Sequence, residues 1–222
     1  MAAVHPAVGE PMKKSADKLK KTKRVRRKLR LAFRLGLFIF FAAIVIYFIV
    51  TAPTVQRKVF YPFRYRDTVE FYSKKYRVDK YLAVAVMKSE SNFTESAISR
   101  SGAIGLMQIM PETADWISTQ LETVPSTEKF SFNAKRLYDP EVNIRYGIWY
   151  LSTLEKEFDG NDVLALAAYN AGRGNVWHWI DKYGWGMDFE DVEQIPFDET
   201  RDYVRKVLHC RTKYQLFYHR EE

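Results

Sequence analysis

The apolar positions of the chain divide it into two unlike parts. An uncharged stretch of 18 residues lies between Arg34 and Pro53, and bulky Phe, Ile, Leu and Val side chains fill most of it. As a helix this stretch would extend about 27 Å, which is close to the thickness of the hydrocarbon core of a membrane. The pattern therefore predicts one transmembrane helix over residues 35–52.

Beyond residue 66, apolar residues recur at intervals of three and four, which is typical of amphipathic helices. Capping signals mark their ends: Asp79 and Asp139 each precede a helix, and Gly172 ends a nearly all-apolar one. The predicted helices cover residues 67–76, 79–90, a segment from 111, 139–158, 162–171, 176–183 and 200–218. Few alternating segments exist to build a sheet, so we expect a mainly α fold with one domain over residues 67–222.

The charge of the chain is as uneven as its apolarity. The net charge is +8, but residues 1–34 carry +10 and the remainder carries −2. Because basic residues beside an apolar span stay in the cytoplasm, we expect a basic cytoplasmic tail over 1–34, a signal anchor over 35–52 and a linker over 53–66. A cleaved signal peptide is the alternative, but both the basic region and the apolar run are longer than such peptides usually have.

The basic tail needs no nucleic-acid partner. Its charge suits attraction to the lipid of the cytoplasmic membrane, and the nearly neutral domain lacks the basic surface that nucleic-acid binding requires. The single cysteine, Cys210, cannot form an intramolecular disulfide, and the four histidines show no zinc-like spacing. We therefore expect no metal and no cofactor.

One carboxylate occupies an unusual position at the end of the second predicted helix. Glu90 follows Leu82 and Val86 at intervals of four and so lies on an apolar stripe. Partial burial and the helix C-terminus both disfavour its ionised form, which would raise its pKa as a general acid at neutral pH requires. The alternative is that Glu90 simply emerges into solvent where the helix ends.

The segment from Ser99 to Pro111 adds a second candidate feature. Glycines at 102 and 105 predict a tight turn that lets another group approach the backbone closely. Gln108 carries an amide that both donates and accepts hydrogen bonds, which suits the N-acetyl and hydroxyl groups of a sugar.

Taken in order, these segments resemble the catalytic domain of the soluble lytic murein transglycosylase family, which is related to goose-type lysozyme. The matching segments are Glu90-Ser91-x-Phe93, Ala97-x-Ser99, Gly102-Ala-Ile-Gly-Leu-Met-Gln108, Pro111-x-Thr-Ala114, Asn143-x-x-x-Gly147-x-x-Tyr150-Leu151, Ala168-Tyr-Asn-Ala-Gly172 and Glu199-Thr-Arg201-x-Tyr203-Val204. The resemblance covers residues 78–208. It departs from the family at Thr94-Glu95, where many members have Asn-Pro.

The resemblance implies a lysozyme-like helical domain that cleaves the β-1,4 bond between N-acetylmuramic acid and N-acetylglucosamine without water, leaving a 1,6-anhydromuramic end. It implies a site in which one carboxylate is the acid and then the base, hydroxyl and amide groups support it, and other side chains line the sugar groove. The acid and base is Glu90, the supporting residues are Ser99, Tyr169 and Asn170, and the residues of the sugar groove are Gln108 and Met110. The implied partners are peptidoglycan glycan strands and membrane lipid.

Two other functions stay open at this point. A muramidase of the same fold would hydrolyse the same bond, and a wall-binding or assembly factor would keep the fold with an idle site. The product separates the first two, because an anhydro end indicates a transglycosylase and a reducing end a hydrolase.

The charge step across the apolar run predicts a single-pass anchor with the N-terminus in the cytoplasm and the domain outside. A reporter protein that is active only in the cytoplasm, fused after Glu222, is therefore expected to be silent in cells. Strong reporter activity from that fusion would contradict this orientation.

Overall fold

The fold is described by a computed structural model that covers residues 10–121 and 132–219. The chain divides into two compact units, Met1–Phe60 and Tyr61–Glu222. This division places the start of the second unit a few residues before the predicted domain boundary, inside the predicted linker.

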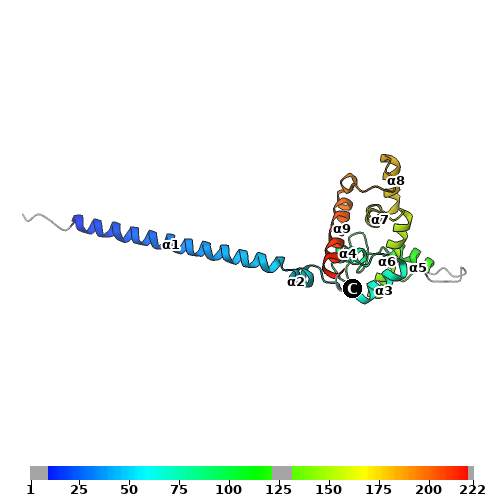
Figure 1. Ribbon diagram of the computed structural model, residues 1–222, viewed down its shortest axis with the longest axis horizontal. Coiled ribbons are helices and arrows are strands. Elements are labelled where there is room, and N and C mark those ends of the chain that lie inside the picture. The colour runs from blue at the N-terminus through cyan, green and yellow to red at the C-terminus, as the bar shows by residue number, and fades with distance from the viewer. Residues whose placement is uncertain (1–9, 122–131, 220–222) are drawn as a thin grey trace, which may run out of the picture. The chain divides into compact units, whose positions relative to one another are not determined.

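The first unit contains α1 (Glu10–Thr51), a continuous helix of 42 residues (Figure 1). Its part from Arg26 to Thr51 is long and apolar enough to cross a membrane, with a mean hydropathy of 2.5 in its most apolar window and none of that window buried. The predicted span therefore forms one exposed apolar helix, which continues toward the N-terminus beyond residue 35. After Pro53 the predicted linker forms two short turns, α2 (Pro53–Val55) and the π-helix η1 (Gln56–Phe60).

The second unit is helical, as the spacing of apolar residues predicts. Its elements are α3 (Arg66–Tyr76), α4 (Lys80–Ser91), α5 (Pro111–Leu121), η2 (Ala134–Tyr138), α6 (Pro140–Glu157), α7 (Asp162–Ala171), α8 (Arg173–Tyr183), η3 (Val192–Gln194) and α9 (Asp198–Tyr218). Two starts were wrong: α9 begins at Asp198 and not at Thr200, and α8 begins at Arg173 and not at Val176. The reason at α8 is that Gly172, with a φ of 89°, both ends α7 and caps α8, so a single residue turns the chain between them.

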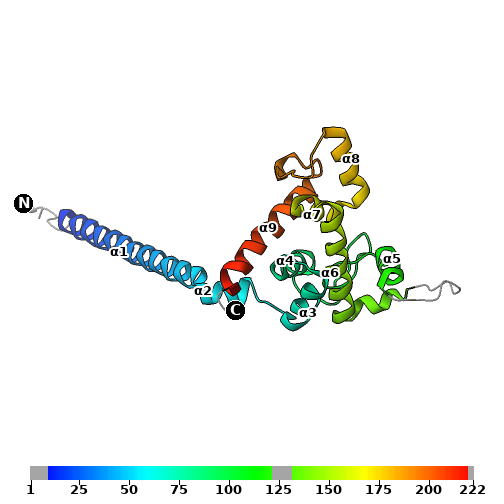
Figure 2. The same cartoon turned by 45° about the vertical axis from the view of Figure 1, so that its right-hand side comes forward.

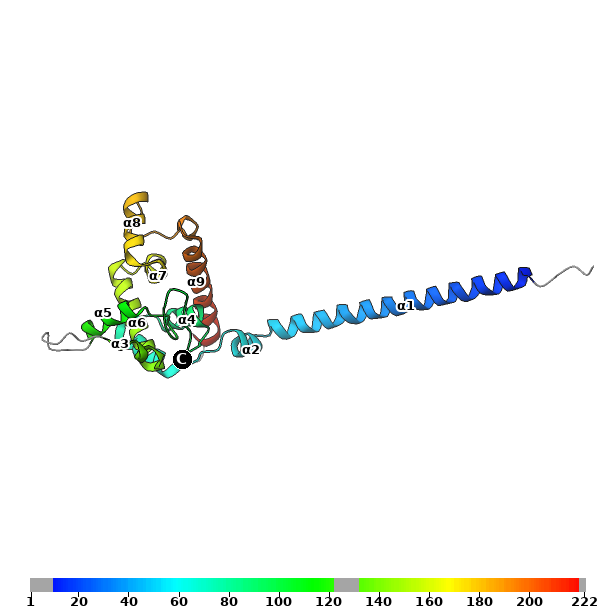
Figure 3. The same ribbon diagram turned by 180° about the vertical axis from the view of Figure 1, so that it is seen from behind.

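Two helices form the centre of this unit. Every residue of α4 from Tyr81 to Met87 is buried, and so is every residue of α7 from Val163 to Ala168. α4 lies between α9 and α6 (Figure 2, Figure 3), while α7 packs against α6, α8 and α9. Because α4 is buried almost to its end, its last turn brings polar residues to the margin of the core.

The predicted helix caps form as expected. Asp79 Oδ1 accepts a hydrogen bond of 2.9 Å from Tyr81 N. Asp139 Oδ1 accepts hydrogen bonds from Glu141 N at 2.8 Å and Val142 N at 3.0 Å. Each cap satisfies amides that the first turn leaves unpaired and is worth about 1 kcal/mol.

An arginine on α9 ties the starts of both central helices together. Arg211 Nε lies 2.6 Å from Asp79 Oδ2, and Arg211 Nη1 contacts Asp162 Oδ2 on α7. Glu155 of α6 stands near the same charges. The pKa of Glu155 is raised to about 7, chiefly by burial and also by the charges of Asp162 and Asp79, while Arg211 opposes the rise.

Replacing Glu155 by Gln is expected to stabilise the fold at alkaline pH. The folded-state pKa of Glu155 exceeds its usual value. The stability that the protonated side chain contributes is therefore fully present below pH 4.5 and is lost as the pH rises through about 7. Because the side chain is partly exposed, we expect a gain of only about 1 kcal/mol at pH 8 and almost none near pH 4. Denaturant unfolding at the two pH values measures this difference.

The matched control is Asp159→Asn, which removes the charge of an exposed carboxylate on the turn after α6. An equal gain from Glu155→Gln at both pH values would contradict the assigned cause.

Candidate active site

The segment after α4 folds into a compact turn, as its two glycines predict. Gly105 N donates to Ala97 O at 2.8 Å, and Ile104 and Ile109 exchange two backbone hydrogen bonds of 3.0 Å. Gly102 and Gly105 have φ values of 93° and 82°, a region that favours glycine. We call residues 97–110 the site loop.

Asn143, completely buried on α6, holds the site loop against the core. Its Oδ1 accepts a hydrogen bond of 2.7 Å from Met107 N. Its Nδ2 donates to Ile104 O and to Leu137 O, each at 2.9 Å. One side-chain amide on α6 thus makes three hydrogen bonds to backbone groups, two in the site loop and one in η2.

The site loop and α6 meet without spare room. A Cβ atom on Gly105 would lie 2.2 Å from Asn143 Nδ2, and a Cβ atom on Gly147 would lie 2.3 Å from Met107 Sδ. Both distances are far shorter than any van der Waals contact. Asn143 and Gly147, one helical turn apart on α6, therefore form the surface on which the loop rests.

Two further side chains bind the carbonyl groups of the site loop. Ser91 Oγ, at the end of α4, donates to Leu106 O at 2.7 Å. Tyr169 Oη, on α7, donates to Met107 O at 2.8 Å. The central helices α4 and α7 are thus both joined to the loop at adjacent peptide groups, next to Glu90.

Glu90 lies one residue before the end of α4 and is largely shielded from solvent. Burial raises the pKa of its carboxyl to about 7, while the Tyr203 hydroxyl and the Lys206 ammonium oppose this rise. Lys206 Nζ is itself held by Ser89 O at 2.7 Å. The predicted upward shift is confirmed, with burial as its main cause, and it leaves the carboxyl close to half protonated at neutral pH.

Two tyrosine hydroxyls adjoin this carboxyl. Tyr169 and Tyr203 are buried there, and burial, followed by the charge of Glu90, raises the pKa of each hydroxyl well above its usual value. Within the residues that the structure describes, Tyr203 Oη makes no hydrogen bond of standard geometry, although it faces Glu90 closely enough to favour the ionised carboxylate. Both phenols stay protonated; Tyr203 Oη can donate to an anionic carboxylate, while Tyr169 Oη already donates to Met107 O.

A hollow of about 240 Å³ opens beside these groups. The structure brings four of the predicted site residues to its wall, together with Tyr150 and Gly172: these four are Gln108, Met110, Tyr169 and Asn170. We call this space the first hollow. Its wall combines apolar, aromatic and amide groups, which is the mixture that a sugar ring can contact.

Asn170 and Ala171 also border a second hollow of about 580 Å³, which continues to the start of α9. Asn170 Oδ1 accepts a hydrogen bond of 2.7 Å from Thr200 Oγ1, which fixes the amide between the two spaces. The two hollows therefore adjoin at the end of α7.

The remaining predicted residues are held within the site loop. Gln108 Nε2 donates to Gly105 O at 2.8 Å and to Ala97 O at 3.2 Å. Ser99 Oγ accepts from Ala103 N at 2.9 Å and lies 2.9 Å from Ser101 Oγ. Gln108 thus reaches the first hollow with its oxygen still available, whereas a contact between Ser99 and Glu90 stays a prediction.

Sequence reasoning assigned no role to three residues that shape this site, Asn143, Tyr203 and Lys206. Asn143 and Tyr203 stood in the matching segments, so the family pattern was the available signal. For Lys206, its place one turn after Tyr203 on α9 was the only hint.

Comparison with known families and sequences identifies the family of this domain. Residues 67–192 match the family described as Transglycosylase SLT domain. The soluble lytic murein transglycosylase of Escherichia coli K12 is 35% identical over 158 residues, which are 71% of this chain and 24% of that protein. The membrane-bound lytic murein transglycosylase C of Edwardsiella ictaluri is 32% identical over 174 residues, 68% of this chain and 46% of that protein.

Solved structures of lytic transglycosylases are also similar to this chain. The 70 kDa soluble lytic transglycosylase of Escherichia coli superposes with a TM-score of 0.64 and 34% identity over 71% of this chain and 25% of that one. The lytic transglycosylase Slt of Pseudomonas aeruginosa, solved as an inactive mutant, superposes with a TM-score of 0.60 and 37% identity over 70% of this chain and 24% of that one. The chain therefore spans about a quarter of the length of the soluble relatives.

Replacing Asn143 by Ala is expected to lower the free energy of unfolding by about 2–4 kcal/mol, because Met107 N and Leu137 O lose their buried partner and a cavity remains. Denaturant unfolding measures the loss. The control is Asn175→Ala, an exposed asparagine whose loss is expected near 0.5 kcal/mol or less. Equal losses from the two variants would contradict the role given to Asn143.

Proposed function

Since the chain belongs to the transglycosylase SLT domain family, we propose that it is a lytic transglycosylase that cleaves peptidoglycan glycan strands between N-acetylmuramic acid and N-acetylglucosamine. The observation that carries this proposal is the Glu90 carboxyl, which has a pKa of about 7 and lies near Tyr169, a residue that lines the first hollow. A group with this pKa can both give and take a proton at neutral pH.

In the proposed reaction Glu90 acts twice. Its protonated form gives the proton to the glycosidic oxygen as the bond to C1 of muramic acid breaks. The resulting carboxylate then takes the proton from the C6 hydroxyl of the same sugar as that oxygen bonds to C1. The product is a 1,6-anhydro ring, no water is consumed, and Glu90 ends protonated as it began.

One carboxylate suffices for this chemistry because the attacking hydroxyl belongs to the substrate. A hydrolase generally needs a second carboxylate as nucleophile or as base for water, whereas an intramolecular hydroxyl arrives at high effective concentration. The nearby acids are engaged or exposed elsewhere: Glu95 accepts from Tyr65 Oη, Asp115 accepts from Phe132 N at 2.8 Å, and Glu112 is exposed on α5.

The groups around Glu90 have complementary proposed roles. Tyr203 stabilises the carboxylate between the two proton transfers, the charge of Lys206 assists it, and Tyr169 supports the site by donating to Met107 O in the site loop. Ser99 and Asn170 support the site, Asn170 through its hydrogen bond to Thr200. Gln108 and Met110 contact the sugar in the first hollow.

Two solved relatives support this assignment. The inactive mutant of the Pseudomonas aeruginosa enzyme carries glutamine in place of a glutamate. The 70 kDa soluble lytic transglycosylase has also been solved in complex with bulgecin A, with a TM-score of 0.63 and 33% identity over 71% of this chain and 25% of that one. The inactivity of the first relative's mutant supports a role for a glutamate in the proposed reaction.

We also propose that α1 anchors the enzyme in the cytoplasmic membrane, with the N-terminus in the cytoplasm and the folded unit outside. The apolar part of α1 and the membrane-bound relative from Edwardsiella ictaluri support the anchor. The basic residues before it support the orientation and contact with lipid headgroups. This arrangement puts the site on the side of the membrane where peptidoglycan lies.

Replacing Glu90 by Gln is expected to abolish release of anhydro-muropeptides from purified peptidoglycan while the fold and glycan binding persist. Glutamine keeps the shape of the side chain but has no proton to transfer. General acid–base catalysis contributes roughly 10²–10⁴-fold, and one group serves both halves of the reaction, so we expect a loss at the upper end or beyond. Mass spectrometry of the released fragments measures it.

Glu112→Gln, which changes an exposed carboxylate on α5, is the matched control and is expected to keep normal activity. A folded Glu90→Gln protein that retains more than about a tenth of wild-type turnover would overturn the role of Glu90. Reducing ends in place of anhydro ends from the wild-type protein would identify a muramidase.

A further inference from the structure

An arginine stands at the rim of the first hollow. Arg173 is the first residue of α8 and directly follows Gly172, which lines the hollow. Arg173 lowers and Glu157 raises the pKa of Tyr150, another residue of the same wall, although burial is the main influence on that hydroxyl. The charges of Arg173 and Glu157 therefore both lie close to the hollow.

The guanidinium of Arg173 is held in one orientation. Its Nε lies 2.6 Å from Glu157 Oε2, and its central carbon lies 5.9 Å from the centre of the Trp116 ring. Glu157 is fixed in turn, because its Oε1 accepts a hydrogen bond of 2.7 Å from Trp177 Nε1. Trp116 packs against Tyr150 with ring centres 6.2 Å apart. A cation–π contact with Trp116 and a single ion pair with Glu157 thus hold the guanidinium.

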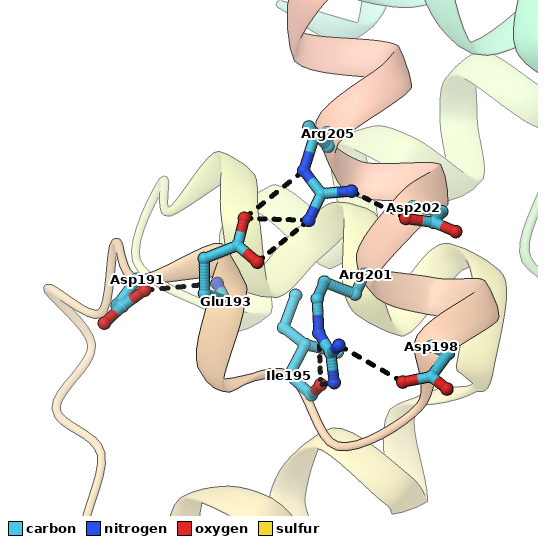
Figure 4. Close-up of polar contacts among 7 residues, drawn as sticks. All are labelled: Asp191, Glu193, Ile195, Asp198, Arg201, Asp202 and Arg205. Carbon is cyan, nitrogen blue, oxygen red and sulfur yellow. Dashed lines mark hydrogen bonds and ion pairs between the residues drawn. The ribbon is translucent and has the colours of Figure 1, made fainter.

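The outer edge of this guanidinium has no partner in the part of the chain that the structure describes. Within that part of the chain Arg173 has one ion pair, through Nε to Glu157, and its side chain is 46% exposed. Arg205 of α9, at 50% exposure, is different: it reaches both oxygens of Glu193 and one of Asp202 (Figure 4). Arg173 therefore keeps its two terminal nitrogens available for a ligand.

The position of Arg173 also conflicts with local stability. A positive charge in the first turn of a helix opposes the helix dipole, and Glu157 offsets this cost only through one contact. Positions where a residue works against its local structure are commonly functional. The conflict is explained if the arginine serves the hollow beside it.

We infer that Arg173 binds a carboxylate of the substrate strand, with its two terminal nitrogens facing the two carboxylate oxygens. A planar guanidinium that is already oriented matches this geometry, and lysine does not. The inference rests on the proposed glycan substrate. Such strands carry carboxylates of two kinds, on their peptides and, where the peptide has been removed, on the lactyl group of muramic acid.

The test measures the affinity of the 222-residue chain, in detergent and with Glu90→Gln to prevent cleavage, for three ligands. The ligands are peptide-bearing glycan, glycan stripped of peptide by an amidase, and a neutral chitin oligosaccharide. Adding Arg173→Gln is expected to weaken binding of at least one carboxylate-bearing ligand about tenfold relative to chitin, or about 1.4 kcal/mol. Arg173→Lys is expected to recover part of this preference, and Arg205→Gln to leave it unchanged.

The pattern of losses identifies the carboxylate. A loss confined to peptide-bearing glycan assigns Arg173 to the peptide, and a loss with stripped glycan assigns it to the lactyl group. Equal weakening of all three ligands, or no weakening of any, would overturn the inference. Because these readouts are affinities, they are separate from the products released by the wild-type chain, on which the proposed function depends.

Discussion

The hydrogen bonds of the buried Asn143 amide are the constraint on which the rest of the site depends. They fix Met107 N and Ile104 O against α6, and this fixes the direction in which the next carbonyl groups point. Only then can Ser91 and Tyr169, from the two central helices, reach Leu106 O and Met107 O. The loop is therefore held by three helices at adjacent peptide groups, and it closes over the end of α4 where Glu90 lies.

The proton affinity of Glu90 results from opposed influences that come from different elements. Burial at the end of α4 favours the neutral acid, while Tyr203 and Lys206 of α9 favour the carboxylate. Together they place the pKa of the carboxyl at about 7. Their balance depends on the packing of α4 against α9, which Arg211 secures at the far end of the same helix through Asp79.

The helices were predictable because their signals are local. Asp79, Asp139 and Gly172 act within one or two turns of themselves, and the apolar spacing between them is visible in the sequence. The raised pKa of Glu90 was predictable for the same reason, since the apolar stripe below it lies on its own helix. The roles of Asn143 and Lys206 were not, because each acts on residues far away in the chain, and the local sequence does not show which residues those are. The early start of α8 was missed since glycine was interpreted only as a terminator.

The absence of a side chain at Gly147 has a consequence for how this domain can diversify. The Met107 side chain fills the space that a Cβ atom on Gly147 would need, and the Asn143 amide does the same at Gly105, so the site loop and α6 are close-packed there. Residues on the open wall of the hollow, such as Met110, can then be exchanged without moving the frame that carries Glu90. A library intended to change substrate preference would accordingly randomise the residues of the wall and keep Gly105, Asn143 and Gly147 unchanged. The wall positions tolerate other side chains, whereas these three close-packed positions do not.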